Sequence, residues 1–237
     1  MYMYGFYGFD FSYFLFMIPA VIISVWAQIK VKTTFSKYSK IRNSRNLTGA
    51  QAAQRVLSHN EIIGVQIQPM AGSLTDNFNP KNNVISLSSD VYDENSIAAV
   101  GVAAHEAGHA VQYGKDYLPL KIRKALVPAA NFGTWVSFPL IFLGFILPVQ
   151  YDFVIYLGIA LFSLAVLFQV ITLPVEFDAS RRAIKALEET NTLYDDELIG
   201  AKKVLNAAAL TYLAAAFSAI LNLLRILLLL SGRRGRD

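Results

Sequence analysis

Four long apolar runs constrain the folding of this chain more than any other feature of its sequence. They cover residues 11–29, 132–149, 153–175 and 207–230, include no acidic residue, and include one basic residue, Arg225. A helix of about 20 apolar residues crosses a hydrocarbon core of about 30 Å. The runs therefore predict a mostly α membrane protein with three to four transmembrane helices.

The composition agrees, with 54% hydrophobic residues and a mean hydropathy of +0.41. Because the chain has no cysteine, a metal site must use His, Asp or Glu. No Lys or Arg precedes the first run, which is also longer than the apolar part of a secretory signal, so we expect a retained anchor. Aromatic residues suited to the headgroup region precede this run: Tyr2, Tyr4, Phe6, Tyr7 and Phe9.

The distribution of Lys and Arg predicts the orientation of the chain. Residues 1–29 contain none, residues 30–127 contain twelve, the turn at 150–152 contains none, and residues 174–206 contain five. Positively charged loops stay in the cytoplasm, so both large polar segments are expected to face it. Basic residues that flank apolar runs also explain the net charge of +4 without nucleic acid. The three arginines after residue 230 leave two alternatives open for the last run, a full crossing or a re-entrant helix.

The resulting organisation has five parts. We predict an N-terminal anchor at 1–29, a small α+β zincin-like segment at 30–127, a transmembrane hairpin at 128–175, a helical segment at 176–206, and a last helix with a basic tail at 207–237.

Within the first polar segment, local patterns predict a helix, two strands and a second helix. Thr48 is expected to cap a helix that ends near Ser58. Residues 65–68 and Val84–Ser88 are expected to form strands, with turns between them at 76–83. A peptide substrate is expected to pair as an added strand near Val84–Ser88.

The second predicted helix, at 97–113, contains an HExxH motif, His105-Glu106-Ala107-Gly108-His109. Histidines four positions apart share one face of a helix, so His105 and His109 are expected to bind one Zn²⁺. Glu106 is then the general base for a zinc-activated water. The alternative is a chance match in which both histidines make ordinary hydrogen bonds. It is disfavoured because two of the three histidines in the chain fall here, on an otherwise apolar helix.

A hydrolytic zinc site needs a third protein ligand, and Glu176 is the best candidate because it directly follows the third apolar run on the predicted cytoplasmic side. Asp178 lies on another face of such a helix and is expected to orient a ligand or a local turn. In the alternative interpretation, both carboxylates pair with Arg181 and Arg182 at a helix start. The oxyanion-stabilising group stays open among Tyr113, Arg181 and Arg182; His59 is expected to be an exposed cap residue.

With these segments in view, the chain resembles the YugP-like family of zinc-dependent membrane proteases over nearly its whole length, through NNVISLS, DVYDENSIAAVGVAAHEAGHAVQY and LPVEFDASRRA. The resemblance implies a neutral zinc metallopeptidase of the bacterial plasma membrane. EFDAS is also similar to the Glu-x-x-Ala-Asp pattern of CAAX-prenyl-protease-like and heat-shock membrane metalloproteases, which implies that Glu176 is the third ligand. Those proteases carry Asp where this chain has Ser180, so a hydroxyl, or Asp178, would have to orient the histidine.

The expected function is that of a membrane-bound metalloendopeptidase with one zinc ion, acting on membrane-associated or unfolded polypeptides. An ATP-driven protease is excluded because no Gly-rich phosphate loop is present. Two alternatives are an intramembrane site-two-type protease and a non-catalytic zinc-binding scaffold that regulates another protease. The sequence leaves an oligomer or a regulatory membrane partner open.

Overall fold

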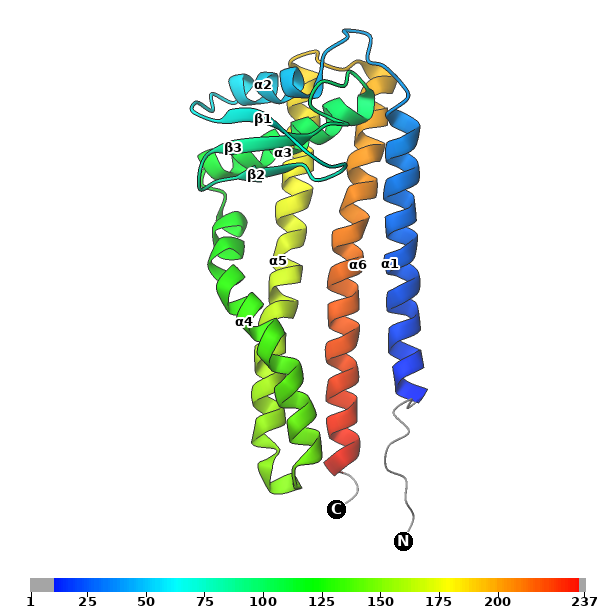
Figure 1. Ribbon diagram of the computed structural model, residues 1–237, viewed down its shortest axis with the longest axis vertical. Helices are drawn as coiled ribbons and strands as arrows, with labels where there is room; N and C mark the ends of the chain where they lie inside the picture. The colour runs from blue at the N-terminus through cyan, green and yellow to red at the C-terminus, as the bar shows by residue number, and fades with distance from the viewer. Residues whose placement is uncertain (1–10, 235–237) are drawn as a thin grey trace. The chain divides into compact units, whose positions relative to one another are not determined.

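A computed structural model describes residues 11–234 of the chain (Figure 1). The five aromatic residues before the first run and Arg236 lie outside the described residues. The elements are α1 (Phe11–Tyr38), α2 (Gly49–His59), β1 (Gln66–Met70), β2 (Asn77–Asn79), β3 (Val84–Ser88), α3 (Ile97–Gly114), α4 (Leu118–Ile146), a 3₁₀ turn (Val149–Tyr151), α5 (Phe153–Glu189) and α6 (Asp195–Arg234).

The chain forms two compact units. A helical unit comprises residues up to Trp26, Ile122–Ile171 and residues from Tyr212 onward, and an α+β unit comprises Ala27–Lys121 and Thr172–Thr211. Four helices, α1, α4, α5 and α6, contribute residues to both units. The prediction of a mostly helical membrane protein with a small α+β part is confirmed.

Every predicted apolar run lies in a long helix, except that the run at 132–149 extends three residues past the end of α4. By length and composition, α1, α4, α5 and α6 can each cross a membrane. The last run belongs to one uninterrupted helix of 40 residues, and this favours a full crossing over a re-entrant segment. Helix α5 continues through Pro174 and joins the third apolar run to the predicted helical segment after it. The 3₁₀ turn at Val149–Tyr151 matches the predicted tight turn.

A full crossing by the last apolar run, at 207–230, would place the arginines that follow it on the side opposite to the one that the charge bias favours. The contacts of Arg233 at the end of α6 explain how one of these charges is accommodated. In the helical unit, Arg233 donates hydrogen bonds to the carbonyl oxygens of Gly144 (2.9 Å) and Leu147 (2.5 Å), and its Nε lies 3.2 Å from Asp152 Oδ1. Unpaired carbonyls at the end of α4 favour a positive charge. The charge of Arg233 is therefore balanced beside the α4–α5 turn.

The α+β unit contains a three-stranded sheet in the order β1-β3-β2. The central strand pairs in parallel with β1, from Gln66↔Val84 to Met70↔Ser88, and antiparallel with β2, from Asn77↔Ser86 to Asn79↔Val84. The turn predicted over Asn77–Asn79 is therefore wrong, because pairing with β3 overrides the poor strand propensity of Asn. A substrate strand added to Val84–Ser88 is also ruled out, since both edges of β3 are paired.

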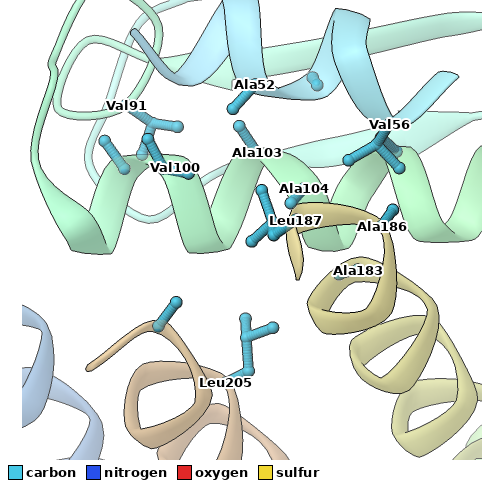
Figure 2. Close-up of a cluster of buried hydrophobic side chains, with 14 of the residues drawn as sticks. Ala52, Val56, Val91, Val100, Ala103, Ala104, Ala183, Ala186, Leu187 and Leu205 are labelled. Atoms are coloured by element: carbon cyan, nitrogen blue, oxygen red, sulfur yellow. The ribbon is translucent and has the colours of Figure 1, made fainter. Parts of the chain in front are cut away.

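The core of this unit consists mainly of small side chains, and these let the helices approach closely. Figure 2 shows side chains from α2, the turn after β3, α3, α5 and α6 meeting in one cluster: Ala52, Val56, Val91, Val100, Ala103, Ala104, Ala183, Ala186, Leu187 and Leu205. All of these side chains are at most 3% exposed. As predicted, Thr48 caps α2, and Gln51 completes a capping box. The cluster holds α3, which carries the motif, against α5.

Candidate active site

The motif helix α3 begins where Ser96 accepts a hydrogen bond from the backbone N–H of Ala99 (3.1 Å). Nearly every residue on its inner faces is Ala, Val or Gly and is buried in the α+β unit. The polar side chains of His105, Glu106 and His109 are therefore held by a rigid element. Among the described residues, α3 is not one of the helices suited to crossing a membrane.

Three side chains from α3 and α5 form a compact donor cluster, here named the His₂Glu cluster. The Oε2 atom of Glu176 lies 3.3 Å from Nε2 of His105 and 3.3 Å from Nε2 of His109. The donor atoms all lie within 4.8 Å of one another. Zinc bonds of about 2.0–2.2 Å in a tetrahedron separate two donors by roughly 3.4 Å, so the donor types and spacing fit Zn²⁺.

A close approach of two backbones brings Glu176 to the motif. A Cβ atom on Gly108 would lie 2.5 Å from the carbonyl oxygen of Ala179, which is shorter than any normal contact. Only glycine therefore allows α3 to lie this close to α5 at the level of the His₂Glu cluster.

Replacing Gly108 with alanine is expected to push α3 away from α5 and weaken zinc binding at least tenfold, because donors must stay within a few tenths of an ångström of their positions. Zinc affinity measured by competition with a chelating dye tests this. Gly101→Ala is the matched control on the same helix, because its Cβ would meet the Ala201 Cβ at an ordinary 3.4 Å. Equal affinities for the two variants would contradict the argument.

Ser180 occupies the position at which the similar proteases carry Asp, and it contacts His105. Its Oγ lies 3.1 Å from Nδ1 of His105. A hydroxyl that accepts from Nδ1–H leaves the lone pair of Nε2 free for a metal ion. A neutral group therefore orients this histidine.

Gln112 was missed by the sequence reasoning, although it lies three residues after His109 on the same helix face. Its Nε2 donates to the carbonyl oxygen of Val175 (2.8 Å) and to Asp178 Oδ2 (2.9 Å). Its Oε1 then faces Nδ1 of His109 at 3.0 Å. Because two acceptors hold the amide nitrogen, Oε1 has to accept from Nδ1–H, and the lone pair of Nε2 of His109 is free for a metal ion.

Asp178 both helps to orient a candidate zinc ligand and pairs with Arg181 and Arg182, the two roles that the sequence suggested for it. Its side chain is 5% exposed, accepts from Gln112, and forms ion pairs with Arg181 and, at 2.6 Å, with Arg182. Asp178 thus reaches His109 through the Gln112 amide, and the two arginines neutralise its buried charge.

The other candidate residues lie elsewhere in the α+β unit. Tyr113 packs against Phe78 of β2, with ring centroids 6.0 Å apart. His59 ends α2 and pairs with Glu189 at 2.9 Å, so it is not a member of the His₂Glu cluster. The assignment of an oxyanion-stabilising group among Tyr113, Arg181 and Arg182 stays a prediction.

The surroundings of the His₂Glu cluster shift the pKa values of Glu106, the candidate base, and His109, a candidate ligand. Burial raises the pKa of Glu106, an effect that His105 and His109 partly oppose and that the Glu176 carboxylate reinforces. Burial lowers the pKa of His109, but the hydrogen bond to Glu176 and the charges of Glu106 and Glu176 outweigh it, so the net shift is upward. The metal-free cluster therefore favours bound protons or a bound cation.

Comparison with known proteins adds two findings. Residues 13–231 match the family described as "Putative neutral zinc metallopeptidase". The chain is also 46% identical over 222 residues to "Putative membrane protease YugP" of Bacillus subtilis (strain 168), covering 93% of this chain and 98% of that protein. No solved structure matches the chain significantly.

Proposed function

Since this chain belongs to the neutral zinc metallopeptidase family, as its motifs predicted, we propose that it is a membrane-bound zinc endopeptidase. The observation that carries the proposal is the convergence of His105, His109 and Glu176 on one point, with Glu106 buried beside them. Two histidines and a glutamate are the protein ligands of several zinc peptidases.

In this proposal each residue of the site has a separate task. His105, His109 and Glu176 would hold one zinc ion, which supplies a Lewis acid and lowers the pKa of water to about 7. Glu106 accepts the proton of the attacking water and donates it to the leaving amine. Ser180 and Gln112 keep the two imidazoles in the tautomer that has a free Nε2.

The free edge of β2 is the proposed binding place for an extended substrate. This strand lies at the edge of the sheet and contacts α3. A polypeptide that adds to such an edge satisfies its backbone hydrogen bonds whatever its side chains are. Unfolded or membrane-associated polypeptides, whose backbone is accessible, are the matching substrate class.

We place the site on the cytoplasmic side of the plasma membrane. The charge bias supports this orientation, because the α+β unit contains most of the Lys and Arg residues. An intramembrane mechanism is disfavoured, since α3 is not among the described helices suited to crossing a membrane. A non-catalytic zinc scaffold is disfavoured because it has no use for a buried carboxylate such as Glu106 beside the cluster.

Metal removal tests the proposal. The purified full chain should contain about one zinc ion per molecule and cleave an unfolded polypeptide, and chelation should abolish the cleavage. Zinc should also raise the midpoint of thermal unfolding, because it binds only the folded cluster. Adding zinc back should restore both properties. Full cleavage by metal-depleted protein would contradict the proposed mechanism.

A further inference from the structure

Besides the candidate active site, the α+β unit contains a cleft of about 540 Å³ between the end of α1 and the beginning of α6. Three lysines line it: Lys30 and Lys37 from α1, and Lys203 from α6. Neither the proposed hydrolysis nor zinc binding uses these side chains.

The spacing of the lining residues shows that the two helices turn matching faces to the cleft. Lys30, Thr34 and Lys37 recur at intervals of three and four on α1, and Lys203 and Asn206 do so on α6. Facing helices normally bury apolar stripes. Here cationic and hydrogen-bonding groups face each other across an open space.

Lys37 lies over the Tyr38 ring, with Nζ 5.5 Å from its centroid, but no ion pair among the described residues includes a lysine of this cleft. None of the described residues that line it is acidic, whereas Arg182, Lys121 and Arg233 each form an ion pair with an aspartate. Three like charges around one concave surface repel each other and raise the local concentration of anions. The cleft is therefore suited to a ligand with at least one negative charge.

The position of the cleft along the helices indicates the source of that anion. Lys30 directly follows the apolar run at 11–29, and Ala207 and Leu210, which also line the cleft, begin the run at 207–230. The cleft thus lies where both helices pass from apolar to polar sequence. Lipid phosphates occupy this level of a membrane, and juxtamembrane lysines attract anionic headgroups.

We propose that this cleft binds the headgroup of an anionic phospholipid, with Lys30, Lys37 and Lys203 around the phosphate and Leu210 toward the acyl chains. Lysine acts as a point charge toward phosphate, and Thr34 and Asn206 add hydrogen-bond donors. The inference is independent of the proposed peptidase activity, because it uses none of the His₂Glu cluster.

Native mass spectrometry of the full chain in a neutral detergent tests this, with phosphatidylglycerol and phosphatidylcholine as probes. Phosphatidylglycerol is expected to bind more tightly. The combined substitutions Lys30→Gln, Lys37→Gln and Lys203→Gln should weaken its binding roughly 100-fold, about fivefold per lysine. Zinc content should not change in this variant, which verifies that it is folded.

The matched control replaces three exposed lysines near the cleft that do not line it, Lys32, Lys40 and Lys202, and removes the same net charge. It should retain binding of phosphatidylglycerol. An equal loss in both triple variants, or equal binding of the two lipids, would overturn the proposal. Competition by millimolar inorganic phosphate as effective as that by the lipid would instead assign the cleft to a free anion and overturn the lipid assignment.

Discussion

Replacing Glu106 with glutamine is expected to reduce peptide hydrolysis by about 10²–10⁴-fold while zinc stays bound. Glutamine keeps the size of the side chain but cannot accept the proton of the attacking water. Burial already disfavours the charged form of Glu106, so a neutral amide should not destabilise the fold. The rate of cleavage of an unfolded polypeptide, together with zinc content from the same preparation, measures both effects.

Glu94→Gln is a suitable control for this experiment. Glu94 is exposed in the loop before α3, and its substitution should leave the rate within about twofold, as for other surface changes. If Glu106→Gln protein cleaves as fast as the unchanged protein, the proposed role of Glu106 is wrong. If the unchanged protein binds zinc but neither it nor any variant cleaves a polypeptide, the result would favour the non-catalytic zinc scaffold.

Replacing Glu176 with glutamine is expected to lower zinc affinity by at least two orders of magnitude and to abolish hydrolysis with it. The substitution removes the only anionic donor of the His₂Glu cluster, and a neutral amide is a far weaker zinc ligand than a carboxylate. Zinc affinity by competition with a chelating dye gives the direct measurement. Activity at saturating zinc then separates lost binding from lost chemistry.

Glu188→Gln is the matched control for this second prediction, since Glu188 lies on the same helix, α5, and is exposed. It should bind zinc as the unchanged protein does. Unaltered zinc affinity in the Glu176→Gln variant would remove Glu176 from the ligand set. In that case the third donor has to be sought elsewhere on the polar segments.

The prediction of the fold from the sequence worked best where one local pattern decides the structure. Apolar runs of about 20 residues match the thickness of a bilayer when they are helical, so α1, α4, α5 and α6 were predicted, although not their full lengths. Thr48 and Gln51 likewise specify the start of α2 within four residues. The short strand β2 was missed because Asn77 and Asn79 favour turns, and only pairing with β3 makes this segment a strand.

The candidate active site likewise divides into residues that a local pattern predicts and residues that only contacts between distant segments identify. His105, Glu106 and His109 follow from a five-residue spacing on one helix, and Glu176 was selected by its motif and its predicted side of the membrane. The groups that orient the histidines were harder to assign. The sequence left the choice between the Ser180 hydroxyl and Asp178 open, and the structure places Ser180 Oγ beside Nδ1 of His105. An isolated glutamine such as Gln112 gives no signal unless its partners are known.

The sequence by itself thus determined the membrane helices and the motif, because both depend on hydropathy and spacing within about 20 residues. The tertiary structure alone decided how the site is completed. Gln112 bonds to residues 63 and 66 positions away, Ser180 bonds to His105 across 75 positions, and Gly108 lies against Ala179. No local pattern encodes such contacts, because they depend on how closely two helices pack.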